Sequence, residues 1–252
     1  AIEALVPFIK DHQRKKELSK IKNLDAKDIQ KLTQILADIT LTTNFENGYL
    51  YVTITIPGTD TRDPIDMCIC MDVSGSMDDE ATKLNELGER VSHGLTLLDI
   101  ARGGAKAAVL CLQPSDRVCL VSYSKSAKVE QLWTHTDDTG KELLSKKLDK
   151  LRPTYTTNLC DGMITSLNQF KDKGCTTNRK KVTFLLTDGV PNVEPPRGHE
   201  YMLNKWKEQN PDIKVMLNTF GFGFSLKDKL LKTLSKLGGG EFDFIPDSAM
   251  VG

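Results

Sequence analysis

The stretch IDMCICMDVSGS, residues 65–76, decides the fold of this chain, because a buried strand leads there directly into a polar loop. Residues 65–71 form a mainly apolar run with the length of a buried strand. Asp72, Ser74 and Ser76 follow at alternate positions, and a glycine between the serines lets the chain curl, so these side chains can turn toward one point. A carboxylate and two hydroxyls are oxygen ligands that suit Mg²⁺. The stretch therefore predicts a strand that ends in a metal-binding loop, with the ion open to an acidic group from outside.

The composition is that of a globular protein without a strong overall charge. The chain has 252 residues, of which 39% are hydrophobic, enough for one large domain or one domain with an extension. Basic and acidic residues balance at 34 each, which argues against a nucleic-acid partner. No apolar segment has the length of a membrane span. The six cysteines form no Cys-x-x-Cys pair, which favours free thiols and a cytoplasmic location, with secretion as the alternative.

Residues 1–46 differ in character from the rest of the chain, and we expect them to form a helical extension. Asp25 is a suitable N-cap, and apolar residues recur after it at helical spacing. These residues are Ile29, Leu32, Leu36 and Ile39. The extension either packs against the domain that follows, over residues 47–252, or forms an arm that binds a partner.

Beyond residue 48, segments typical of strands alternate with segments typical of helices. The expected strands cover residues 49–56, 65–71, 118–123, 128–132, 182–186, 213–220 and 242–245. The expected helices cover residues 95–112, 141–150, 159–170, 200–209 and 226–237. Apolar strands joined by helices predict an α/β fold, Rossmann-like and doubly wound, with a mostly parallel central sheet and helices on both faces. We expect the segment 128–132 to be one short antiparallel edge strand.

Three separated segments bring polar side chains to the edge of this sheet where ligands bind. In open α/β sheets that edge lies at the carboxyl ends of the strands. Asp72 and Asp188 each follow directly after one of the most apolar strands, and Thr157 stands just before a helix. We therefore expect Asp72, Ser74, Ser76, Thr157 and Asp188 to share one site.

In these three segments the chain resembles the von Willebrand factor A (VWA) domain family and its metal-ion-dependent adhesion site (MIDAS). That site uses an Asp-x-Ser-x-Ser loop, a distant Thr and a later Asp, and the resemblance covers residues 49–250. It implies that Ser74, Ser76 and, in some states, Thr157 bind Mg²⁺ directly, while the two aspartates bind it directly or through water. Mn²⁺ or Ca²⁺ would suit these oxygens in part.

The resemblance also implies a function. An ion held by few carboxylates keeps its positive character and attracts an Asp or Glu side chain from a protein partner. The chain would then be a non-catalytic, Mg²⁺-dependent protein–protein interaction domain of the adhesion type.

A narrower similarity lies further along the chain, in the second half of the expected domain. The stretches are LLTDGVPN (185–192), PPRGH (195–199), NTFGFG (218–223) and FIPDS (244–248). They are similar to a fungal and protist subgroup of the family, in which the domain is joined to U-box or hedgehog/intein (Hint) modules. This similarity suggests a link to a multidomain or ubiquitin-pathway assembly. Many relatives continue into a final helix after the last strand, which we expect to be missing here.

The same segments allow plainer interpretations. Residues 72–76 are also typical of a polar turn that closes a strand, with Asp72 as the N-cap of the next helix. Thr157, which has other threonines nearby, is typical of a helix cap. The three acids at residues 78–80 are expected to be solvated acids at the start of a helix.

Two other classes of function remain open. The first is a metal-dependent phosphatase in which Asp72 attacks phosphate. That chemistry commonly uses a second acid two residues further on, and Ser74 stands at that position, where it cannot act as an acid at neutral pH. The second is a structural subunit in which residues 1–46 and the sheet edges make constitutive contacts and the metal is incidental.

Overall fold

The structure is a computed structural model that describes residues 40–46, 49–55, 62–84, 90–176, 178–189, 191–223 and 228–245. The chain divides into two compact units, Ala1–Arg62 and Asp63–Gly252. In the first unit, β1 (Thr40–Glu46) pairs with β2 (Tyr49–Thr55) as an antiparallel hairpin.

This hairpin changes the expected organisation of the N-terminal part. Thr40–Glu46 forms a strand and not the end of a helical extension, consistent with a threonine-rich and aromatic sequence that favours strands. The sequence between the two strands, Asn47-Gly48, is typical of two-residue hairpin connections and is consistent with this pairing. β2 pairs with β1 within the first compact unit, which ends at Arg62. The helix expected after Asp25 lies outside the described residues.

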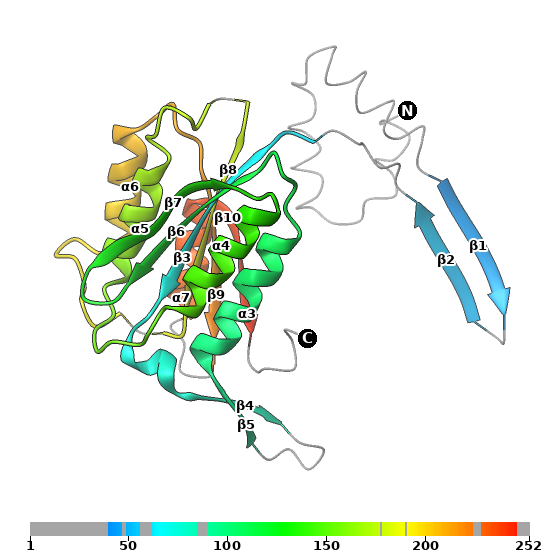
Figure 1. Cartoon of the computed structure of the whole chain (residues 1–252), viewed down its shortest axis with the longest axis horizontal. Helices are drawn as coiled ribbons and strands as arrows, with labels where there is room; N and C mark the ends of the chain where they lie inside the picture. Colours follow the sequence, from blue (N-terminus) through cyan, green and yellow to red (C-terminus); the bar gives the residue numbers. More distant parts are fainter. Residues whose placement is uncertain are drawn as a thin grey trace. The chain divides into compact units, whose positions relative to one another are not determined.

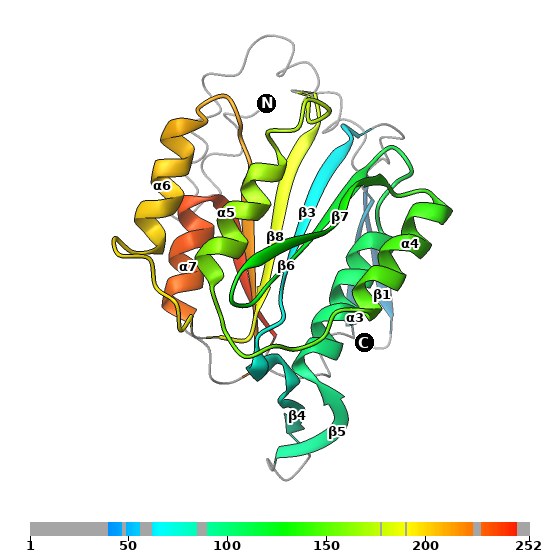
Figure 2. The same ribbon diagram turned by 60° about the vertical axis from the view of Figure 1, so that its left-hand side comes forward.

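The second unit is built on a six-stranded sheet with the order β10-β9-β8-β3-β6-β7 (Figure 2). Its strands are β3 (Ile65–Asp72), β6 (Arg117–Tyr123), β7 (Ala127–His135), β8 (Lys180–Thr187), β9 (Met216–Phe222) and β10 (Gly239–Ile245). All neighbours are parallel except β6 and β7. The mostly parallel sheet with an antiparallel edge strand is therefore confirmed, although that strand has nine residues and is longer than expected.

In the described part of the chain, five helices cover the two faces of this sheet, as expected (Figure 1). They are α3 (Leu97–Leu110) and α4 (Asp138–Asp149) on one face, and α5 (Leu159–Gln169), α6 (His199–Gln209) and α7 (Asp228–Leu237) on the other. Alternate residues of β3 point to the two cores: Ile69 and Met71 pack with α3 and α4, whereas Cys68 and Cys70 pack with α5. Because β3 is buried on both faces, its sequence is a nearly continuous apolar run.

A second hairpin, which was not expected from the sequence, follows the polar loop. The loop contains a 3-10 turn (Gly75–Asp78) and leads into β4 (Glu80–Leu84) and β5 (Arg90–Thr96), which pair antiparallel before α3 begins. The acids at residues 78–80 therefore do not start a helix. α3 begins at Leu97, two residues later than expected, and is preceded by a capping box.

The capping box explains where α3 begins. The Asp99 N–H donates to the Thr96 hydroxyl at 3.2 Å, and the Thr96 N–H donates to the Asp99 carboxylate at 3.0 Å. These two bonds satisfy donors that would otherwise lack partners at the start of the helix.

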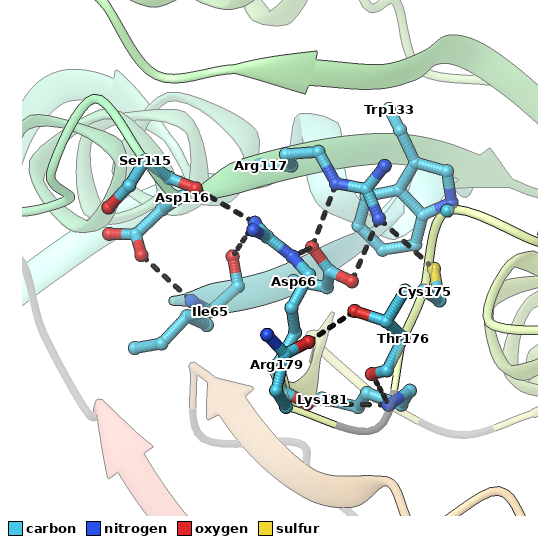
Figure 3. Close-up of polar contacts among 12 residues, drawn as sticks. Ile65, Asp66, Ser115, Asp116, Arg117, Trp133, Cys175, Thr176, Arg179 and Lys181 are labelled. Carbon is cyan, nitrogen blue, oxygen red and sulfur yellow. Dashed lines mark hydrogen bonds and ion pairs between the residues drawn. The ribbon is translucent and has the colours of Figure 1, made fainter. Parts of the chain in front are cut away.

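At the amino edge of the sheet, one buried carboxylate joins three segments (Figure 3). Asp66, near the start of β3, is fully buried and accepts two hydrogen bonds from Arg117, each 2.9 Å long. It also accepts one from Arg179 Nε at 2.6 Å. Arg179 in turn donates to the Ser115 carbonyl at 2.9 Å, so β3, β6 and the segment before β8 are held together. Burial alone would raise the pKa of Asp66, but the hydrogen bonds and charges of the two arginines outweigh it and lower the pKa below 3.8.

Asp66→Asn should destabilise the fold by about 3 to 5 kcal/mol, because it leaves two arginines without their shared buried partner. The lowered pKa in the folded state means that Asp66 contributes stability above pH 3.8 and that this contribution is lost as the pH falls further, through the folded-state pKa. Urea denaturation between pH 2 and 7 measures both effects, and the variant should show a weaker loss of stability in acid.

Asp149→Asn is the matched control, because Asp149 makes an exposed ion pair with Lys106 at 2.7 Å. Removing this pair should cost less than about 1 kcal/mol. If both variants lost the same stability, the Asp66 cluster would not hold the sheet as described.

α5 approaches β6 closely through a glycine. A Cβ atom at Gly162 would lie 2.4 Å from a ring carbon of Tyr123, a distance that real side chains do not tolerate. Gly162→Ala should therefore cost about 1 to 3 kcal/mol through overpacking. Gly103→Ala in α3 is the control, because nothing lies within 4 Å of its Cβ position, and it should stabilise the helix by about 0.5 to 1 kcal/mol. Thermal unfolding should show a lower melting temperature for Gly162→Ala and a higher one for Gly103→Ala than for the wild type.

Candidate metal centre

The structure brings the three predicted segments to the carboxyl edge of the sheet. β3 and β8 are parallel neighbours, so Asp72, at the end of β3, and Asp188, just after β8, lie at the same edge. The segment before α5 is tied to this edge by the Thr154 N–H, which donates to the Val73 carbonyl at 2.7 Å. Thr157 follows three residues later, and all three segments therefore meet.

A pocket of about 350 Å³ opens at this edge, with Ser76, Thr157 and Asp188 in its wall. Asp72 and Ser74 lie behind the wall and are fully buried. The Ser74 hydroxyl lies 3.3 Å from the Ser76 hydroxyl, which links the buried pair to the pocket. The five residues predicted from the sequence thus belong to one cluster, three at the pocket and two behind it.

Asp72 is held in place by both of its carboxylate oxygens. Oδ1 accepts the Ser74 N–H at 2.8 Å, which gives the loop its tight curl. Oδ2 accepts the Thr187 hydroxyl at 2.6 Å and the Tyr123 hydroxyl at 3.3 Å. Burial raises the pKa of Asp72 to about 6, the nearby charge of Asp188 raises it as well, and the hydrogen bond from Thr187 opposes the shift. Asp72 is therefore the anchor of the loop, bonded to the ends of both neighbouring strands.

Asp188 differs from Asp72, because one of its carboxylate oxygens has no partner among the described residues. Its side chain is only 5% exposed, and Oδ1 is buried without a hydrogen bond to any of the described residues. Burial raises the pKa of Asp188, a hydrogen bond with the Ser76 hydroxyl opposes this, and the charge of Asp79 adds to the increase. A buried carboxylate oxygen without a donor is costly in free energy. A cation at this position would remove that cost.

Thr157 is held rigidly at the pocket by the loop after β8. Its N–H donates to the Asn192 side chain at 2.9 Å, and its carbonyl accepts the Asn192 N–H at 3.1 Å. The cap of α5 is Asn158, whose side chain accepts the Asp161 N–H at 3.2 Å. The interpretation of Thr157 as a helix cap is therefore wrong, and Thr157 is one of the residues that line the pocket.

The interpretation of residues 72–76 as a polar turn with Asp72 as a helix cap is correct for the turn and wrong for the cap. Asp72 does close a polar turn, through its bond to the Ser74 N–H, but it caps no helix. The 3-10 turn that follows has no side-chain cap, and α3 is capped by Thr96.

Three supporting residues were not predicted as part of the site: Tyr123, Thr187 and Asn192. Thr187 offered a local signal, because it stands between an apolar strand and Asp188. No local signal pointed to Tyr123, since its bond to Asp72 depends on the pairing of β6 with β3.

The chemistry of this cluster suits a hard divalent cation. The described parts of the chain contain no group of three or more His, Cys, Asp or Glu side chains that could hold a metal. The five-residue cluster has two carboxylates, Asp72 and Asp188, and otherwise offers hydroxyl oxygens, while a third carboxylate, Asp79, also lies in the pocket wall. Oxygen ligands with a low total charge fit Mg²⁺, which keeps several waters, better than they fit zinc.

Comparisons with known proteins agree with this architecture. Residues 67–190 match the family model described as von Willebrand factor type A domain. A von Willebrand factor type A protein from Catenulispora acidiphila has a similar structure, with a TM-score of 0.62 and 18% identity, over 80% of this chain and 42% of that chain. BatB from Bacteroides thetaiotaomicron gives a TM-score of 0.58 and 13% identity, over 74% and 92% of the two chains. The pilus adhesin SpaC from Lactobacillus rhamnosus GG gives 0.57 and 14%, over 84% and 33%.

At these identities the solved structures establish the fold alone, which is the Rossmann-like α/β fold. The chain spans less than half the length of the Catenulispora protein. The comparison with curated proteins finds no match. Within the described ranges, no helix combines the length and the apolar character needed to cross a bilayer.

The bond between Thr187 and Asp72 can be tested with a valine of nearly the same shape. Thr187→Val should destabilise the fold by about 1 to 3 kcal/mol, because a buried carboxylate loses its shortest hydrogen bond. Thr183→Val is the matched control in the same strand, since the Thr183 hydroxyl is buried without a hydrogen-bond partner in the described structure. This second variant should be neutral or stabilising. Urea denaturation compares the two, and equal losses would contradict the role given to Thr187.

Proposed function

We propose that this chain, whose residues 67–190 match the von Willebrand factor type A (VWA) family model, is a non-catalytic, metal-dependent protein-interaction module. It binds an Asp or Glu side chain of a partner through a divalent cation, Mg²⁺, in a MIDAS-type site. The ligands are Asp72, Ser74, Ser76, Thr157 and Asp188. Mn²⁺ and Ca²⁺ are possible substitutes, because they take the same kind of oxygen ligands.

The observation that carries this proposal is the unpaired Oδ1 of Asp188. Asp188, Ser76 and Thr157 all line one pocket, so an oxygen without a donor among the described residues belongs to the same wall as two hydroxyl-bearing side chains. A cation satisfies all three at once. Neutral hydroxyls leave such a cation short of negative charge, and it then supplies an attractive centre for a carboxylate.

Each residue has a separate task in this proposal. Asp72 sets the loop conformation through its bonds to Ser74 and Thr187, and it adds negative charge behind the pocket. Ser74 and Ser76 offer hydroxyl oxygens whose mutual distance of 3.3 Å suits neighbouring ligands of one ion. Thr157 offers its hydroxyl from the opposite segment, in a position that Asn192 fixes.

The position of Asp72 speaks against the phosphatase alternative. A carboxylate that attacks phosphate must reach the substrate, whereas Asp72 is fully buried behind the pocket wall. Both of its oxygens already accept hydrogen bonds from Ser74, Thr187 and Tyr123. These bonds support a structural and metal-holding role, which fits a binding module.

A cytoplasmic location and a link to a multidomain or ubiquitin-pathway assembly belong to this proposal. All six cysteines are free, which supports a reducing compartment. The solved structures with the same fold include a protein described as a pilus adhesin, which supports a binding role.

Metal binding should raise the stability of the wild-type protein and depend on Ser76. Mg²⁺ at about 100 times its Kd should add about 2.7 kcal/mol to the free energy of unfolding. Ser76→Ala removes a hydroxyl at the pocket without touching the buried bonds of Asp72, and it should weaken binding by at least about tenfold. Thermal unfolding and calorimetric titration with Mg²⁺, Mn²⁺ and Ca²⁺ measure both effects. Ser145→Ala, on α4, is the control and should bind like the wild type.

The partner side of the proposal is tested by affinity purification with wild type and Ser76→Ala, each in Mg²⁺ or in EDTA. Proteins released by EDTA and also lost in the variant define metal-bridged partners. A wild-type protein that none of the three ions stabilises, or partners that survive both treatments, would favour the structural-subunit alternative.

A further inference from the structure

A groove lies at the amino edge of the sheet, at the opposite end of β8 from the metal cluster. It consists of two adjoining cavities. The first, of about 660 Å³, is lined by the start of β8 and the segment that enters β9. The second, of about 490 Å³, lies between the carboxyl ends of α6 and α7. The cavities share Lys214, Val215 and two glycines, so they form one continuous surface, which we call the lysine groove.

The lysine groove is strongly positive in a chain whose total charges balance. Five lysines line it: Lys180, Lys181, Lys207, Lys214 and Lys236. Its lining contains one acid, Asp212. Lys181 and Lys207 donate to backbone carbonyls, at 2.7 Å and 2.6 Å, which leaves their charges unneutralised. None of the five forms an ion pair with a carboxylate in the described part of the chain. The groove therefore favours a ligand with several negative charges.

The groove is also apolar between its lysines. Val182, Ile213 and Leu237 are half-buried in its walls, and Met216 is 47% exposed. The second cavity has Trp206 in its wall, a side chain with only 5% of its surface exposed. Surfaces of this kind accept a bulky apolar side chain, and the lysine stems extend the apolar contact.

The lysines bind carboxylates and phosphates alike, so the apolar walls of the groove, and not its cations, favour an acidic peptide. The one arginine in the lining, Arg179, is already bound to Asp66 and to the Ser115 carbonyl (Figure 3). No arginine fork is therefore free in the groove for bidentate binding of phosphate. Lysine charges beside apolar walls match a peptide that carries both acids and apolar side chains.

We propose that the lysine groove binds an extended acidic segment of a partner protein. A bulky apolar side chain of this segment enters the cavity between α6 and α7, and flanking Asp or Glu residues pair with Lys180, Lys214 and Lys236. The chain's own residues 1–39 do not fit this description, because they contain eight basic and six acidic residues. β8 has eight residues and spans about 26 Å, so the groove and the metal cluster can be occupied at the same time.

The test uses nuclear magnetic resonance of the ¹⁵N-labelled chain with a defined probe. The probe is the end-blocked peptide Asp-Glu-Leu-Asp-Phe-Glu, and the same peptide with serine in place of leucine and phenylalanine is the comparison. The chain has two tryptophans, so the Trp206 indole signal reports on the groove and the Trp133 signal serves as an internal reference. We expect saturable shifts at Trp206, Gly238 and Gly239, the same in Mg²⁺ and in EDTA, and none at Trp133.

Charge reversal tests the role of the lysines. Combining Lys180→Glu with Lys214→Glu should weaken peptide binding by at least about tenfold, because attraction becomes repulsion. Both side chains are exposed, so the fold should be unaffected, which circular dichroism checks. Lys205→Glu, an equal charge change on α6 outside the groove, should bind the peptide like the wild type.

Three outcomes would overturn the proposal. The first is the absence of shifts at Trp206, and the second is equal binding by the wild type and the double variant. The third is equal binding of the serine peptide or of inorganic tripolyphosphate, which would mark a general polyanion surface. The peptide signals do not involve the metal cluster. A negative peptide result would therefore leave the proposed metal-dependent function unaffected, and a negative metal-binding result would leave the lysine groove proposal unaffected.

Discussion

The structure depends on two buried carboxylates at the two ends of β3. Asp66 binds Arg117 of β6 and Arg179 before β8, and Asp72 binds the last residues of the same two strands, Tyr123 and Thr187. A buried carboxylate is tolerated only when donors surround it. A shift of register by one residue would leave both acids unpaired and move their side chains to the wrong face. The pairing of the three central strands is therefore specified from both ends.

The two ends differ in how their negative charge is balanced, and this difference separates structure from function. At the amino edge two arginines lower the pKa of Asp66, so the charge is neutralised within the protein. At the carboxyl edge only neutral hydroxyls and a backbone N–H bind Asp72, whose pKa is raised to about 6 with Asp188 close by. The carboxyl edge thus concentrates negative charge without a bound cationic side chain in the described structure. That imbalance is the physical basis of the proposed metal site.

Most of the fold followed from local patterns, and the exceptions have physical reasons. Apolar runs with the length of strands, such as that of β3, identify buried parallel strands because both faces must be apolar. The hairpin of β4 and β5 could not be predicted from local patterns, because its strands are short, partly polar and stabilised by each other. The helical expectation for Thr40–Glu46 was wrong for a similar reason, because this strand depends on pairing with β2 across the Asn47-Gly48 sequence, which is typical of hairpins.

The sequence by itself determined the layered α/β fold and the identity of the five candidate ligands, because periodicity and the spacing of oxygen-bearing side chains are local properties. Only the tertiary structure decided which of them face the pocket, that Asn158 rather than Thr157 caps α5, and that Asp188 keeps a buried oxygen unpaired. It also decided the lysine groove, whose residues come from four separate segments. Such features depend on which strands and helices become neighbours, and that is settled by packing across long stretches of chain.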